Sequence, residues 1–152
     1  MNSDAGSADS LITSAISNEN GDSLIGWITQ SSVMVQKLSK DGRKTGNAFA
    51  VNTFHGGAFY EPAIAMNDNG WFVASWKNSV QGGNADDFGG IYAQVMTPGG
   101  VKAGPEFAIP SDKTQSQDNT GITLDRRGRM RAVWTNSNGN FGSSSSIRTR
   151  FF

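Results

Sequence analysis

Length, composition and charge already exclude several classes of protein. The chain has 152 residues, the length of one ordinary domain or of a repeat array. Its 13 basic and 13 acidic residues balance, so it lacks the broad positive field of sequence-independent nucleic-acid binding. No window approaches the roughly 20 apolar residues of a membrane span, and the absence of cysteine excludes disulfides and thiolate metal sites. We therefore expect no nucleic-acid partner and no membrane insertion.

One pattern recurs along the chain: a glycine stands six positions before a tryptophan, in residues 18–27, 67–76 and 125–134. The segments that follow the tryptophans also match one another in phase. They are residues 33–38, 91–96 and 147–152. A recurrence at roughly 50 residues predicts tandem structural repeats.

Each repeat contains short apolar segments with alternating polarity, which is typical of half-buried β-strands. In chain order the expected strands are 11–17, 23–29, 32–38 and 47–53, then 62–67, 71–77, 90–96 and 106–110, then 120–125, 129–135 and 146–152. Asn20-Gly21 and Asn69-Gly70 supply the positive φ of tight hairpins between first and second strands. Antiparallel up-and-down connectivity follows.

Four-stranded up-and-down units at this period are typical of β-propeller blades. The sequence therefore predicts an all-β fold of three tandem blades within a single repeat domain, 1–152. The blades span about 11–53, 62–110 and 120–152, and 1–10 form a partial strand or a flexible lead-in. The third copy has no fourth strand.

The second copy carries a more specific pattern, in Pro62-Ala-Ile-Ala65, Gly70 through Trp76, Gly90-Ile-Tyr-Ala-Gln94 and Gly104-Pro-Glu-Phe107. It resembles the propeller-like repeats of large secreted and surface-attached bacterial proteins, P-x-IA, DG-x-FVV-x-W, G-IYAQ-R-F and G-x-EF-x-VN. The third copy departs from this pattern at Arg126-Arg127-Gly128 and at Arg150. The resemblance implies an extracellular or cell-surface location, although residues 1–10 contain no export signal.

Three blades are too few to close a ring, since closed propellers typically use four to eight. An open stack leaves two apolar blade faces exposed, which soluble monomers avoid. We therefore expect self-association, with a dimer of six blades favoured. The alternatives are a fragment of a longer protein and three blades packed into another kind of sandwich.

Five aromatic residues recur at fixed repeat positions, and we expect them to form the core between blades. They are Trp27, Trp76, Trp134, Phe49 and Phe107.

The connections between blades and those between second and third strands lie on one face of a propeller. The connections between second and third strands differ in length among the copies. Variable loops on a rigid scaffold are where recognition usually occurs. Trp71 is also a candidate for ligand binding. Its counterparts in the other copies are Asp22 and Arg129, so the repeat does not require a tryptophan there. Packing between blades is the alternative role of this residue. The predicted ligand-binding residues are Phe54, His55, Tyr60, Glu61, Trp71, Asp86, Asp87, Phe88 and Phe141, and the same loops gather Phe59, Asp112 and Asp118.

The simpler interpretation is that these aromatics plug neighbouring blades and that the loops are plain solvated connections. His55 is the only histidine and has no partner for nucleophilic catalysis. Asp86-Asp87 suit Ca²⁺, but no EF-hand spacing surrounds them. We predict no cofactor, no metal site and no catalytic residue.

The mixture of aromatic and hydrogen-bonding side chains suits glycans. The main hypothesis is a non-enzymatic, lectin-like binding or adhesion module that takes a glycan or a surface protein through the loop face. The first alternative is a carbohydrate-active propeller enzyme, in which Glu61 and either Asp86 or Asp87 supply the two carboxyl groups. The second is an engineered or excised propeller fragment with no function of its own.

Overall fold

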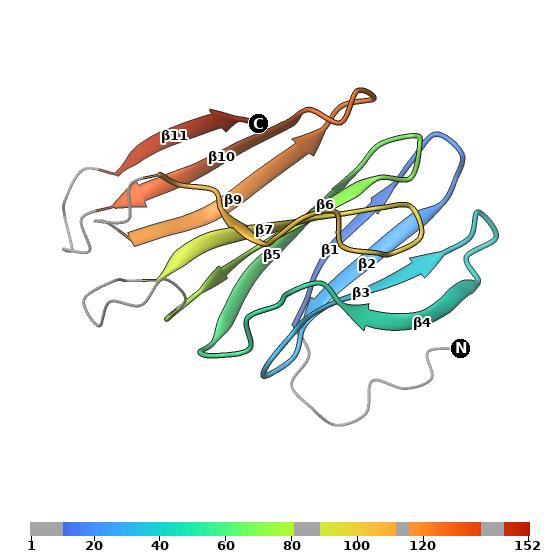
Figure 1. Cartoon of the computed structure of the whole chain (residues 1–152), viewed down its shortest axis with the longest axis horizontal. Helices are drawn as coiled ribbons and strands as arrows, with labels where there is room; N and C mark the ends of the chain where they lie inside the picture. The colour runs from blue at the N-terminus through green and yellow to red at the C-terminus, as the bar shows by residue number, and fades with distance from the viewer. Residues whose placement is uncertain (1–10, 81–88, 112–115, 138–144) are drawn as a thin grey trace.

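Three antiparallel β-sheets form the protein in the computed structural model (Figure 1), which describes residues 11–80, 89–111, 116–137 and 145–152. The strand orders are β1-β2-β3-β4, β5-β6-β7-β8 and β11-β10-β9. The strands are β1 Leu11–Ser17, β2 Ser23–Ile28, β3 Val33–Leu38, β4 Lys44–Ala50, β5 Phe59–Met66, β6 Phe72–Asn78, β7 Gly90–Met96, β8 Phe107–Ala108, β9 Ser116–Leu124, β10 Met130–Ser137 and β11 Ser146–Phe151. The predicted fold class, tandem up-and-down propeller blades, is confirmed.

The first strand of each sheet lies innermost. Strand β1 contacts β5 and β5 contacts β9, while β4 and β8 lie at the outer edges of their sheets. The sheets follow one another like blades about an axis, with the β1–β2, β5–β6 and β9–β10 hairpins at one end and the connections between sheets at the other (Figure 1). Within the described ranges, no helix is long and apolar enough to cross a membrane.

Two inner strands begin earlier than their expected bounds of 62–67 and 120–125. Strand β5 starts at Phe59 and β9 at Ser116, because pairing with the second strand resumes beyond an irregularity in the ladder. Phe59 pairs with Asn78 before the irregularity, and Ala63 pairs with Ser75 after it. Such β-bulges leave residues unpaired and bend the strand without ending it.

The outer strands are shifted or shorter than the expected 47–53 and 106–110. Strand β4 ends at Ala50, and the N–H of Val51 still donates to the carbonyl of Val33 at 2.9 Å. In return, the carboxamide oxygen Oδ1 of Asn52 accepts the N–H of Val33, also at 2.9 Å. Asn52 is 2% exposed, and its Nδ2 donates to the carbonyl of Phe54 at 2.7 Å. One side chain therefore closes the first sheet and begins the connection to the second.

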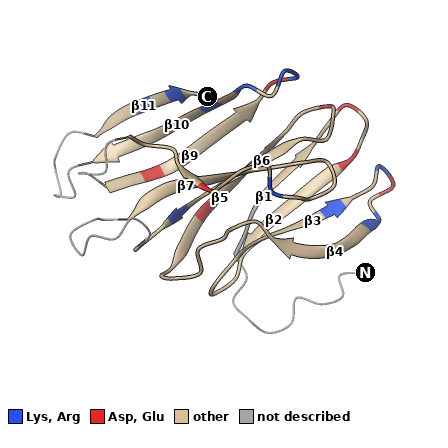
Figure 2. Ribbon diagram, in the orientation of Figure 1, with Lys and Arg blue, Asp and Glu red and all other residues tan. Residues whose placement is uncertain are grey.

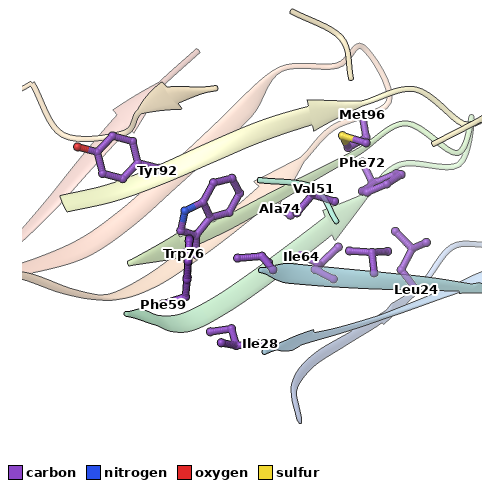
Figure 3. Close-up of a cluster of buried hydrophobic side chains, with 12 residues drawn as sticks. Leu24, Ile28, Val51, Phe59, Ile64, Phe72, Ala74, Trp76, Tyr92 and Met96 are labelled. Carbon is purple, nitrogen blue, oxygen red and sulfur yellow. The ribbon is translucent and has the colours of Figure 1, made fainter. Parts of the chain in front are cut away.

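The hydrophobic core lies between sheets rather than within one. The first cluster joins the first and second sheets around Leu24, Phe72 and Trp76, as Figure 3 shows. The second cluster joins the second and third sheets and includes Val73 and Trp134. Trp76 is 0% exposed and Trp134 7% exposed, which confirms the expected core role of both residues.

Trp27 differs from its two counterparts because it is only half-buried. Burial alternates along β2: Leu24 and Ile28 are buried against the second sheet, so Trp27 faces the other way. At the opposite end of the stack, Ile147 and Phe151 of β11 are 78% and 66% exposed. Each outer face thus carries apolar side chains that no described sheet covers.

A recurring glutamine ties the third strand to the hairpin that follows it. Gln94 Nε2 donates to the carbonyls of Val95 and Gly104, both at 3.0 Å, and Gln36 makes the equivalent bonds in the first sheet. Arg150 occupies this position in the third sheet and donates instead to the carbonyl of Ile109 in the second sheet, at 2.9 Å. The departure from the repeat at Arg150 therefore makes a contact between blades.

We predict that Trp76→Ala costs about 3–5 kcal/mol of unfolding free energy, because it empties a fully buried site between two sheets. Trp27→Ala should cost clearly less in the monomeric chain, since no described sheet covers that ring. Urea unfolding of both variants measures the difference. Equal losses would contradict the assignment of Trp27 to a free outer face.

We propose that two copies associate through their outer faces, which carry Trp27 on one side and Ile147 and Phe151 on the other. Light scattering should report a dimer, and Trp27→Ala should shift the mass toward the monomer. Val101→Ala, at a residue 65% exposed and remote from these faces, should not. A stable, folded wild-type monomer at all accessible concentrations would exclude this association.

Candidate functional site

The inner strands β5 and β9 carry bulges at the same repeat position, at the end where the sheets are connected. Glu61 has φ 49° and Asn119 has φ 55°, the only described non-glycine residues with positive φ. Counting back from Asn67 and Asp125, the two residues are counterparts. Positive φ is uncommon outside glycine, and such strain gathers at functional sites. These bulges are therefore the first candidates for a functional site.

The two bulges are joined by a hydrogen bond between blades. The backbone N–H of Asn119 donates to Oε2 of Glu61 at 2.6 Å. Glu61 is exposed, and Oε1 makes no hydrogen bond that the structure shows among the described residues. The carboxyl group is thus held at one oxygen and open to a ligand at the other.

A second carboxylate lies beside this bond on β9. Asp118 forms an ion pair with Lys77 of β6, with side chains 30% and 16% exposed respectively. Ser116 Oγ donates to the other carboxylate oxygen of Asp118 at 3.0 Å. The hydroxyl of Thr135 donates to the Asp118 carbonyl at 3.0 Å. Asp118 is therefore fixed in place by three elements of two sheets.

We call Glu61, Lys77, Ser116, Asp118 and Asn119 the bulge cluster. It combines two carboxyl groups, one ammonium group and a hydroxyl on neighbouring inner strands. Pairs of carboxyl groups carry out acid–base chemistry at glycosidic bonds. The sequence did not single out Lys77 or Asn119, and it gathered Asp118 with the loops without selecting it. The sequence signal that could have selected Asp118 is its position directly before Asn119, the counterpart of Glu61 in the third repeat.

The remaining predicted residues of the loop face are less suited to chemistry. His55 Nδ1 lies 3.0 Å from the carbonyl of Ser31 and 3.3 Å from Nδ2 of Asn52, so it holds the connection between the first and second sheets. Phe54 and Tyr60 are 39% and 47% exposed. Phe59 is 5% exposed and belongs to the first core cluster. These residues offer loop packing and apolar area rather than reactive groups.

Several predicted residues lie outside the described residues, namely Asp86, Asp87, Phe88, Asp112 and Phe141. Among the residues that the structure does describe, no group of three or more acidic residues or histidines could hold a metal ion.

Trp71 lies at the other end of the sheets from Glu61. It directly precedes β6, in the hairpin that connects β5 to β6 (Figure 1). The structure therefore does not bring it together with the predicted loop residues, because the first-to-second-strand hairpins lie opposite the connections between sheets.

Polar contacts connect the β1–β2, β5–β6 and β9–β10 hairpins at the end of the sheets where Trp71 lies. Arg126 Nε donates to Asp68 at 2.7 Å, and its Nη2 donates to Glu19 at 2.6 Å, so one guanidinium joins three hairpins. The other oxygen of Asp68 accepts the N–H of Glu19 at 3.2 Å. Figure 2 shows the basic β9–β10 hairpin next to acidic positions of its neighbours. The departure from the repeat pattern at Arg126 is thus a contact between blades.

These contacts favour the ionised acids. The side-chain hydrogen bond from Arg126, followed by the backbone hydrogen bond from Glu19, lowers the pKa of Asp68 below its ordinary value. The backbone and side-chain hydrogen bonds of Arg129 likewise lower the pKa of Asp125.

Comparison with known proteins gives a likeness of fold. No family model and no curated protein matches the chain by sequence. An endo-arabinase from Bacteroides thetaiotaomicron is similar in structure, with TM-score 0.59 and 15% identity over 95% of this chain and 57% of that one. A protein of unknown function from Dyadobacter fermentans has TM-score 0.62 and 13% identity over 95% and 50%. An α-L-arabinanase from Penicillium chrysogenum, solved with arabinobiose, has TM-score 0.53 and 16% identity over 87% and 41%.

The chain thus spans about half the length of these solved chains. Two of the three are named as an endo-arabinase and an α-L-arabinanase, which contradicts the main hypothesis of a non-enzymatic binding or adhesion module. The alternative of a carbohydrate-active propeller enzyme agrees better with them. The sequence favoured the non-enzymatic function because the candidate carboxyl groups come from separate strands and form no linear motif.

We predict that Asp68→Asn lowers stability at neutral pH and that the loss disappears in acid. A lowered pKa in the folded state stabilises the protein above the unfolded value, here 3.8, and this contribution is lost as pH falls through the folded value. Thermal unfolding of wild type and variant from neutral pH down to acid measures the effect, which salt should weaken.

Asp41→Asn is the control for this series, because the Asp41 carboxylate makes no hydrogen bond that the structure shows among described residues. A constant stability difference between wild type and Asp68→Asn across the pH range would contradict the role of the Arg126 contact.

Proposed function

We propose that the chain forms part of a carbohydrate-active enzyme of the propeller type that hydrolyses glycosidic bonds at the bulge cluster. The observation that carries the proposal is the hydrogen bond between the Glu61 carboxylate and the Asn119 bulge, with Asp118 adjacent on the same strand. It places two carboxyl groups from two blades at the same end of the inner strands.

Glycoside hydrolysis needs two carboxyl groups with different tasks. One gives its proton to the leaving oxygen as the glycosidic bond breaks, and the other activates a water molecule or attacks the sugar. Glu61 is exposed and has an oxygen free to exchange a proton with a substrate. Asp118 is held by Lys77 and Ser116, which suits the group whose position must stay fixed beside the sugar.

Arabinan is the first substrate to test, since two of the structurally similar proteins are named for acting on it. At 15% and 16% identity these proteins share the fold, and the substrate is part of our proposal. The exposed aromatic rings of Phe54 and Tyr60 lie in the connection that leads to Glu61, with Tyr60 directly before it, and are the side chains that would contact sugar rings. An extracellular location stays a prediction and is compatible with a polysaccharide substrate.

We predict that Glu61→Gln and Asp118→Asn each lower hydrolysis of arabinan at least about a hundredfold, as expected for loss of a general acid or base. Release of reducing sugar by the chain measures activity, and thermal melting confirms that each variant is folded.

Glu106→Gln is the matched control. Glu106 also accepts a backbone N–H from outside its own sheet, that of Thr53 at 2.7 Å, but it lies away from the bulge cluster. This variant should keep full activity. Wild-type protein without hydrolysis on a panel of arabinans, xylans and galactans, or full activity in Glu61→Gln, would reject the proposed function.

A further inference from the structure

A groove lies between the β5–β6 and β9–β10 hairpins, at the end of the sheets opposite the bulge cluster. Its volume is about 350 Å³. Trp71, Val95 and Leu124 form apolar walls, and the polar lining includes Asn69, Arg126 and Arg127. The fold needs no such groove, because the corresponding position of Trp71 holds Asp22 or Arg129 in the other blades.

Trp71 offers an exposed ring carried on an ordered turn. The side chain is 39% exposed, whereas Trp76 and Trp134 are buried in the core. Its backbone N–H donates to Asn67 Oδ1 at 3.1 Å, and its carbonyl accepts the N–H of Asn67 at 2.9 Å. A ring on an ordered turn loses little freedom when a ligand stacks on it.

The charges of the groove favour a carboxylate ligand. Among the described residues that line it there are two arginines and no acidic side chain. Arg126 is occupied by Asp68 and Glu19, but the guanidinium of Arg127 makes no hydrogen bond or ion pair that the structure shows with the described residues. A free guanidinium pairs with a carboxylate through two parallel hydrogen bonds.

We propose that this groove binds an acidic saccharide, with a sugar ring stacked on Trp71 and its carboxylate paired with Arg127. Asn69 also lines the groove, and its amide would bond a ring hydroxyl. The groove and the bulge cluster lie at opposite ends of the sheets, so the proposal stands independently of the proposed hydrolysis.

The indole N–H resonances of the four tryptophans report binding at single sites. Loss of one resonance in Trp71→Phe assigns Trp71. Titration of the wild type with digalacturonate should shift this resonance and leave those of Trp27, Trp76 and Trp134 in place. Galactobiose, the neutral counterpart, should bind at least about tenfold more weakly.

Arg127→Gln should abolish the preference for the acidic sugar while the protein keeps its melting temperature. Arg43→Gln, at an exposed arginine of the β3–β4 hairpin, is the matched control and should keep the preference. No shift of Trp71 with digalacturonate, equal binding of both disaccharides, or an unchanged preference in Arg127→Gln would each overturn the proposal. Neither outcome of this binding experiment bears on the proposed hydrolysis at Glu61, since that activity is measured separately.

Discussion

Burial between blades is the constraint on which the rest of this structure depends. A single blade has two faces and no core of its own, so its apolar side chains become buried only against another blade. Trp76 and Trp134 occupy the same repeat position and are buried because a sheet precedes each of them; Trp27 has the same sequence context and stays half-buried. Neighbouring blades, rather than local sequence, decide which aromatic residues belong to the core.

Contacts between blades also explain where the copies differ. Arg150 replaces the glutamine that elsewhere ties two strands of one sheet, and it bonds the neighbouring sheet instead. Arg126 interrupts the turn pattern of the third copy and joins three hairpins. Glu61 reaches the backbone of the next inner strand. The shared positions build each blade, and these individual positions hold the blades to one another.

The period of the sequence predicted the blades and most strand positions, because alternation and turn glycines are local signals. It did not predict the bulges at Glu61 and Asn119, since a non-glycine residue with positive φ has no distinctive sequence pattern. The strand ends therefore differed from expectation at these positions. The sequence did not predict the candidate site for a related reason. Lys77 and Asp118 are far apart in the sequence and form their ion pair only when two sheets pack together.

The two bulges show how strain and chemistry are combined in the inner strands. Positive φ at a non-glycine residue costs of order 1–3 kcal/mol and persists only where the surroundings stabilise it. Here the hydrogen bond of 2.6 Å links the side chain of one strained residue to the backbone of the other. Glycine at position 61 would relieve the backbone strain but would remove the carboxylate that stabilises the Asn119 bulge. Backbone geometry alone would favour glycine at position 61. The presence of glutamate is therefore explained by its carboxylate and not by its backbone conformation.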